Sequence, residues 1–136
     1  MRHFPLPIPH RDRTSPLDFI PRSSDPAHRG EMMWKVLSQL KITQGPLAGR
    51  RLGEVAPPWQ ERWVRTLYGA VDPTTGQPRY DEAFLLIAKK NGKSSLIGML
   101  AIAHCIAFPE ERGLVVVLAK VKEQAHLCYD SMAATI

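Results

Sequence analysis

The chain has 136 residues, of which 44% are hydrophobic, so it can form one domain with a buried core. No apolar run approaches the ~18–20 residues that a membrane span needs, and early prolines argue against a secretory signal. Two cysteines and five scattered histidines give no metal-ligand pattern, and the net charge of +5 suits contact with nucleotides or nucleic acid.

The first part of the chain differs in composition from the rest. Residues 1–30 contain six of the twelve prolines, several arginines and no periodic apolar pattern. We expect them to form an irregular, disordered arm, in which a solvated tail is favoured over contact with DNA or a partner. Residues 31–136 carry the periodic apolar patterns and are expected to form an α/β domain.

The elements before the centre of the chain are predicted from spacing and turn residues. Apolar residues at helical intervals predict helices over residues 31–41 and 59–69. Between them, residues 43–49 predict a loop, and residues 50–55 predict a short extended segment that two prolines stop. Turn-forming dipeptides predict a turn or hairpin over residues 70–81.

The centre of the chain alternates between strand-like and helical patterns. Residues 84–88 and 114–119 are short apolar runs, typical of strands buried on both faces. Helical spacing covers residues 94–108 between them and residues 122–136 after them. Two buried strands joined by a helix form a βαβ unit with a parallel sheet. The predicted fold class is therefore α/β, a parallel sheet with flanking helices.

A polar segment, AKKNGKSS at residues 88–95, joins the first predicted strand to its helix. A strand, a loop with Gly-Lys-Ser and a helix form the context of a phosphate-binding loop. Gly92 allows a close approach to the unpaired amides of the helix N-terminus, Lys93 would reach the β/γ-phosphates of ATP, and Ser94 would bind Mg²⁺. Because Ile87 replaces the first glycine of the usual pattern, a basic turn with solvated lysines explains these residues as well.

The segment resembles the deviant Walker A motif in the large terminase subunit of tailed bacteriophages. That family often lacks the first glycine and places a basic residue four positions before the Walker lysine, where Lys89 stands here. The sequence PPWQ at residues 57–60 resembles the family's adenine-recognising Q motif, and an amide can both donate to and accept from adenine. The resemblance runs from about Gly45 to the C-terminus. It implies nucleotide contacts by Gln60, Lys89, Lys90, Asn91, Gly92, Lys93, Ser94 and Ser95.

The same resemblance implies a fold, a chemistry and partners. The fold would be a partial P-loop NTPase, with Lys93 and Lys89 as its catalytic residues and ATP and Mg²⁺ as its cofactors. Lysine in place of arginine at residue 89 loses bidentate geometry toward the γ-phosphate. The implied partners are double-stranded viral DNA, the small terminase subunit and the portal, in a ring homo-oligomer of the full-length protein in the cytoplasm of the bacterial host.

Parts of a complete packaging motor are absent from this sequence. No apolar run after Ser95 ends in the acidic residue that holds Mg²⁺, and the family's nuclease is absent as well. We therefore expect the chain to be truncated within the ATPase domain, to bind nucleotide weakly and not to hydrolyse it at a useful rate. The alternatives are another P-loop ATPase or kinase fragment, and a basic nucleic-acid-binding module without nucleotide chemistry.

Overall fold

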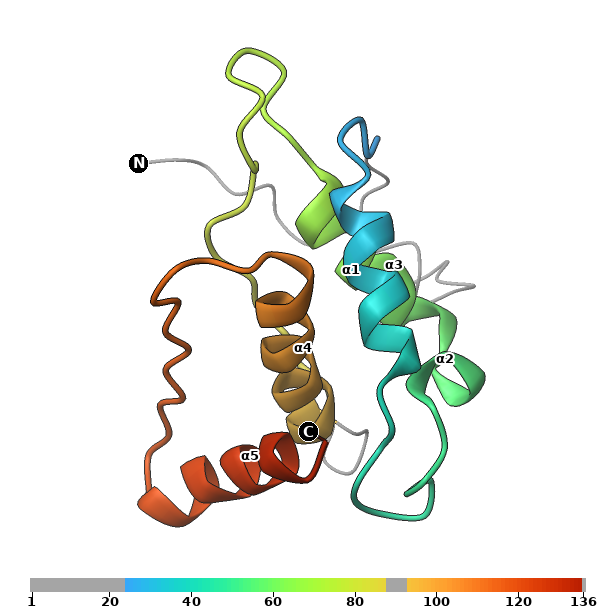
Figure 1. Cartoon of the computed structure of the whole chain (residues 1–136), viewed down its shortest axis with the longest axis vertical. Coiled ribbons are helices and arrows are strands. Elements are labelled where there is room, and N and C mark those ends of the chain that lie inside the picture. The colour runs from blue at the N-terminus through green and yellow to red at the C-terminus, as the bar shows by residue number, and fades with distance from the viewer. Residues whose placement is uncertain (1–23, 88–92, 136) are drawn as a thin grey trace, which may run out of the picture.

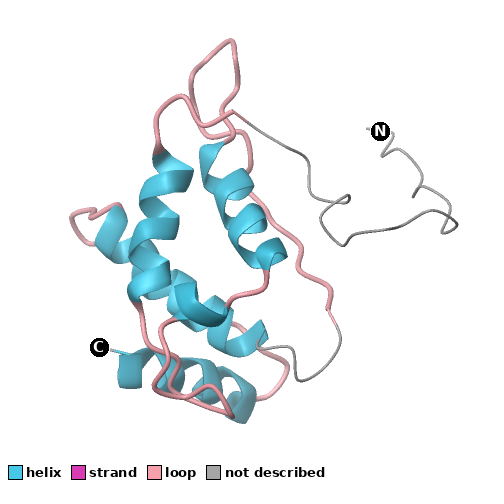
Figure 2. Cartoon of the chain, turned by 90° about the vertical axis from the view of Figure 1, so that its right-hand side faces the viewer, coloured by secondary structure: helices cyan, strands magenta, loops and turns pink. Residues whose placement is uncertain are grey.

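A computed structural model of the chain describes residues 24–87 and 93–135, which form five helices joined by loops (Figures 1 and 2). The helices are α1 (Arg29–Gln39), α2 (Leu52–Val55), α3 (Pro58–Gly69), α4 (Lys93–Ala107) and α5 (Lys122–Thr135). Backbone pairing within the described ranges is limited to two isolated bridges, between Lys41 and Arg51 and between Val71 and Pro78.

The predicted parallel sheet is wrong for the described residues. Both apolar runs are extended connections rather than strands. Phe84 is 96% exposed and Leu118 is 88% exposed, although Leu85 packs against the core. Apolar and β-branched residues favour an extended backbone, but a strand also needs a hydrogen-bonded neighbour and cross-strand side chains. Among the described residues of the first run, Leu85 packs against the core. The second run connects α4 to α5 (Figure 1).

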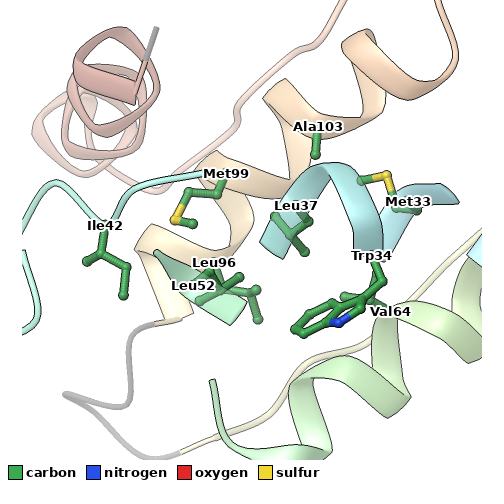
Figure 3. Close-up of a cluster of buried hydrophobic side chains, with 9 residues drawn as sticks. All are labelled: Met33, Trp34, Leu37, Ile42, Leu52, Val64, Leu96, Met99 and Ala103. Atoms are coloured by element: carbon green, nitrogen blue, oxygen red, sulfur yellow. The ribbon is translucent and has the colours of Figure 1, made fainter. Parts of the chain in front are cut away.

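The core is built by α1, α3 and α4. Helix α1 lies between the other two and runs antiparallel to both (Figure 1). A Cβ atom on Gly30, at the start of α1, would lie 2.5 Å from the carbonyl oxygen of Arg65, so only glycine permits this crossing near the end of α3. The buried side chains repeat at helical intervals on each helix. Figure 3 shows them: Met33, Trp34, Leu37, Ile42, Leu52, Val64, Leu96, Met99 and Ala103.

The four long helices confirm the predicted helical segments, with boundaries that shift by one or two residues. Helix α1 begins two residues early, and the Asp25 side chain accepts a hydrogen bond from the backbone N–H of Glu31 at 2.9 Å. Pro58 occupies the first position of α3, where its fixed φ suits the helix and no N–H is needed.

The predicted extended segment over residues 50–55 is wrong, because residues 52–55 form α2. Leu52 explains the difference. Its side chain is 5% exposed within the core, and its backbone N–H donates to the carbonyl of Leu40 at 3.0 Å. A single turn of helix is too short for hydrophobic periodicity to reveal, so it is fixed by this anchor rather than by local propensity.

The loop and turn predictions on either side of α3 agree with the structure. Residues 43–49 form a loop, and residues 70–81 contain a turn in which Asp72 caps two backbone N–H groups, those of Thr74 at 2.7 Å and Thr75 at 3.0 Å. These hydrogen bonds lower the pKa of the Asp72 carboxyl. None of the described helices is long and apolar enough to cross a membrane.

Candidate functional site

The first turn of α4 presents small polar and basic side chains to solvent. Lys93 and Ser94 are exposed, Ser95 is half-buried, and this turn carries no acidic residue. Within the described ranges, neither the Lys93 ammonium nor the Ser94 hydroxyl has a hydrogen-bond or ion-pair partner. The first amides of a helix lack intrahelical partners, and the helix dipole adds partial positive charge there. This end of α4 therefore has the charge and the donors that an anion requires.

Buried apolar side chains of α4 lie directly beneath this polar first turn. Leu96 and Met99 are each 1% exposed and belong to the core cluster shown in Figure 3. Gly98, on the adjoining face, brings α5 close, because a Cβ atom there would lie 3.3 Å from the Cγ of Met132. Packing of Leu96 and Met99 in the core and of Gly98 against α5 thus fixes the orientation of the first turn. Its polar side chains remain exposed and can contact a ligand.

Gln60 lies in the first turn of α3, and its side chain is buried. It is only 5% exposed, and its Oε1 atom has no hydrogen-bond partner among the described residues. A buried amide oxygen left without a partner costs about 1–3 kcal/mol. Residue chemistry alone would have placed Gln60 at the surface, so the structure adds an unsatisfied acceptor that the sequence did not indicate.

The starts of α3 and α4 lie toward the same end of the helical bundle. Both helices run in the same direction in Figure 1, and the Tyr68 hydroxyl of α3 is hydrogen-bonded to Nδ1 of His104 in α4 at 3.1 Å. Because this bond joins the C-terminal halves of the two helices, their N-terminal turns point away from it together. The first turns of α3 and α4, which contain Gln60 and Lys93, therefore lie toward the same end of the bundle.

Half of the predicted nucleotide contacts can be placed. Gln60, Lys93, Ser94 and Ser95 are described, and they come from the first turns of two helices. The other predicted contacts lie outside the described residues, so the structure gives no geometry for them. These are Lys89, Lys90, Asn91 and Gly92.

The opposite end of α4 carries a cluster that sequence reasoning missed. Phe108 stacks on Tyr68 with ring centroids 5.8 Å apart, His104 lies 5.6 Å from Phe108, and the Arg29 guanidinium lies 4.2 Å from the Phe108 centroid. Burial raises the pKa of Tyr68, and the charge of Arg29 opposes that effect. The four-residue spacing of His104 and Phe108 is the one sequence signal for this cluster, because its other members come from distant helices.

One family matches the sequence. The ATPase domain of the terminase large subunit matches residues 58–136, which is more than half of the chain. The match begins at the first residue of α3 and continues through α4 and α5, so it includes Gln60, Lys93 and Ser94. No curated protein and no solved structure matches the chain.

Proposed function

The chain belongs to the family of terminase large subunit ATPase domains, and on this premise we propose that the first turn of α4 binds the phosphates of ATP. The family assignment agrees with the resemblance drawn from residues 57–60 and 88–95. The chain is thus the ATP-binding portion of a terminase large subunit, whose role lies in DNA packaging. The observation that carries the proposed site is the exposed Lys93–Ser94 pair, which has no partner among the described residues and lies in a helical first turn that carries no acidic residue.

The residues at this turn fit magnesium-bound ATP. A lysine ammonium neutralises phosphate charge, and a serine hydroxyl is a hard oxygen ligand of the kind that Mg²⁺ prefers. When bound, Mg²⁺ would neutralise charge on the phosphate oxygens. We assign phosphate binding to Lys93, the metal contact to Ser94, and further phosphate contacts to Ser95 and to Lys89, Lys90, Asn91 and Gly92 of a Walker A loop. Lys89 would contact the γ-phosphate as a second cation.

Titration of the purified chain with Mg-ATP by calorimetry tests this assignment. Lys93→Ala should weaken binding by about tenfold or more, since it removes a phosphate-binding charge, and the helical circular dichroism should not change. Lys122→Ala is the matched control, because Lys122 is also an exposed lysine at the first residue of a helix. Equal losses for both variants, or none for Lys93→Ala, would refute the assignment.

We propose that Gln60 contacts the adenine base. Its unpaired Oε1 supports this role, because the amino group of adenine would supply the missing donor. Since the amide is buried, binding would require the side chain to turn toward the ligand. Gln60→Ala should therefore weaken binding of ATP more than that of GTP. Equal weakening of both nucleotides would assign Gln60 a structural role instead.

The finer biological setting is also a proposal. We propose a bacteriophage or prophage origin, action in the cytoplasm of the bacterial host, and double-stranded viral DNA, the small terminase subunit and the portal as partners of the full-length ring. The competing hypothesis is a basic DNA-binding module, which predicts salt-sensitive DNA affinity that ATP does not affect. DNA affinity of that kind in a chain that fails to bind Mg-ATP would favour the module.

A further inference from the structure

We propose that three exposed cations, Lys35, Lys41 and Arg51, form a basic surface that binds the phosphate backbone of DNA. These residues belong to the segment 32–53, which holds four cations and no acidic residue. The segment precedes residues 58–136, which the family match covers. The basic surface therefore shares no residue with the proposed ATP site, and its assignment does not depend on that site.

Lys41 and Arg51 lie directly opposite each other in an antiparallel β-bridge. The backbone N–H groups of the next residues, Ile42 and Leu52, donate to carbonyls on the opposite segment, at 2.9 Å and 3.0 Å. A pair flanked in this way has its Cα atoms about 4.5 Å apart, and its side chains leave the backbone on the same face. Ile42 and Leu52 are 9% and 5% exposed, so their side chains occupy the inner face. The Lys41 and Arg51 side chains therefore share the outer face, which is exposed to solvent.

The C-terminal part of α1 extends this outer face. Nη1 of Arg51 donates a hydrogen bond to Oε1 of Gln39 at 3.0 Å. Lys35 precedes Gln39 by four residues, so it lies one turn earlier on the same face of α1, about 6 Å along the helix axis. The three cations thus follow one another across the surface, and the Gln39 amide orients the Arg51 guanidinium without neutralising it.

The basic surface has no neutralising carboxylate among the described residues. The nearest carboxylates in the sequence belong to Glu31 and Glu54, and each has another partner. Nδ1 of His28 lies 3.1 Å from the Glu31 carboxylate, and Nε of Arg50 donates to Glu54 at 2.9 Å. Like charges directly opposite each other in a bridge are destabilising. The bridge therefore retains a repulsion that an anionic ligand would relieve.

The arrangement of the cations favours a polyanion over a single anion, because they lie in a row on an exposed face. DNA presents a regular row of phosphate charges, and a protein cation that contacts a phosphate releases a counterion. The basic surface offers no aromatic side chain on which a base could stack, so its contacts are to the backbone and carry no sequence information. Binding without sequence preference agrees with a role in DNA packaging.

Fluorescence anisotropy of a short labelled DNA duplex, titrated with the purified chain at several salt concentrations, tests the proposal. The double variant Lys41→Gln, Arg51→Gln removes two phosphate contacts. Its affinity at low salt should fall by about tenfold or more, and the slope of log K against log salt should become less steep by about two. The double variant Lys120→Gln, Lys122→Gln is the matched control. It removes the same charge from two exposed lysines outside the basic surface, so it should keep the wild-type slope.

Three results of this titration would overturn the proposal. Equal affinities of the two double variants would assign binding to net charge rather than to the basic surface. No DNA affinity at low salt, in a chain that circular dichroism shows to be helical, would exclude DNA as the partner. Equal affinity for poly-glutamate of the same charge would identify an acidic protein as the occupant. Calorimetry should show unchanged Mg-ATP affinity in Lys41→Gln, Arg51→Gln, so that failure of the ATP site and failure of the basic surface are seen separately.

The repulsion across the bridge gives a second readout. Lys41→Gln relieves it, so this variant should raise the midpoint of urea denaturation at low salt while it weakens DNA binding. Lys35→Gln should weaken DNA binding without this gain, because Lys35 lies on α1 and has no cation opposite it in a bridge. A midpoint that Lys41→Gln lowers or leaves unchanged would overturn the proposal, since it would show that the bridge holds no repulsion for a ligand to relieve.

Discussion

The two ends of α4 differ in how their side chains are used. At the C-terminal end, His104 and Phe108 contact Tyr68 of α3 and Arg29 of α1, through a hydrogen bond, ring stacking and a cation–π contact. At the N-terminal end, Lys93 and Ser94 are exposed and have no partner among the described residues. The side chains at the C-terminal end of α4 have partners within the protein. Those at the N-terminal end have none among the described residues and remain available to a ligand.

This difference suggests that the two ends of α4 have different roles: the C-terminal end holds the helix in place, and the N-terminal end is the proposed ligand site. A group that already has a partner within the protein gains little from a ligand, because the ligand must replace that partner. An unpaired charge at a helix N-terminus keeps its full capacity for phosphate. The C-terminal cluster and the buried Leu96 hold α4 in place, so that under the proposed assignment its first turn would offer donors to ATP at little conformational cost.

The largest expected effect comes from Leu96, which is buried beneath the proposed ATP site. Leu96→Ala should lower the free energy of unfolding by about 2–5 kcal/mol, because it leaves a cavity beneath the first turn. Ile97→Ala is the control, since Ile97 is next in sequence and 37% exposed, and it should cost much less. Urea denaturation followed by circular dichroism measures both values. Equal costs would mean that Leu96 does not anchor this end.

A smaller effect is expected at the C-terminal cluster. Tyr68→Phe removes the hydrogen bond to His104 and keeps the ring stacked on Phe108. The free energy of unfolding should fall by about 0.5–1.5 kcal/mol, the usual net value of one hydrogen bond, with unchanged affinity for Mg-ATP. Denaturation and calorimetry on the same variant test both statements. A large loss of ATP affinity would contradict the separation of the two ends.

The smallest of the three effects on the free energy of unfolding is expected from raising the pH above 10, which deprotonates Tyr68 in the unfolded chain. Burial raises the pKa of Tyr68 above its usual value of 10.0, so the folded chain keeps this proton where the unfolded chain has lost it. The contribution is complete below pH 10 and falls as the pH rises further. Burial also raises the pKa of Cys128, above 9.0. The wild type should therefore lose more stability than Tyr68→Phe above pH 10, and equal losses would assign the effect to other groups.

The sequence predicted the features of this fold that depend on nearby residues. Helical spacing located the four long helices, and Pro58 marked the start of α3. The motif at residues 88–95 and the sequence PPWQ led to the family that the match to residues 58–136 supports. These signals are short in range, because periodicity, capping and motif spacing are all properties of consecutive residues.

The features that the sequence missed depend on distant contacts. The pattern of residues 84–88 and 114–119 satisfies the local requirement of a strand, yet pairing depends on what lies beside each run in space. The Tyr68–His104 hydrogen bond joins residues 36 positions apart. The burial of Gln60 likewise results from the packing of α3 in the core, and a polar residue in a helical first turn gives no sign of it.

Amide hydrogen exchange along α4, with and without saturating Mg-ATP, tests the central claim most directly. We predict that ATP slows exchange of the amides in the first turn, from Ser94 to Leu96, and leaves those of the last turn, from His104 to Ala107, almost unchanged. The Lys93→Ala variant should lose this protection. Equal protection of both ends, or protection confined to the last turn, would contradict an ATP site at the start of α4.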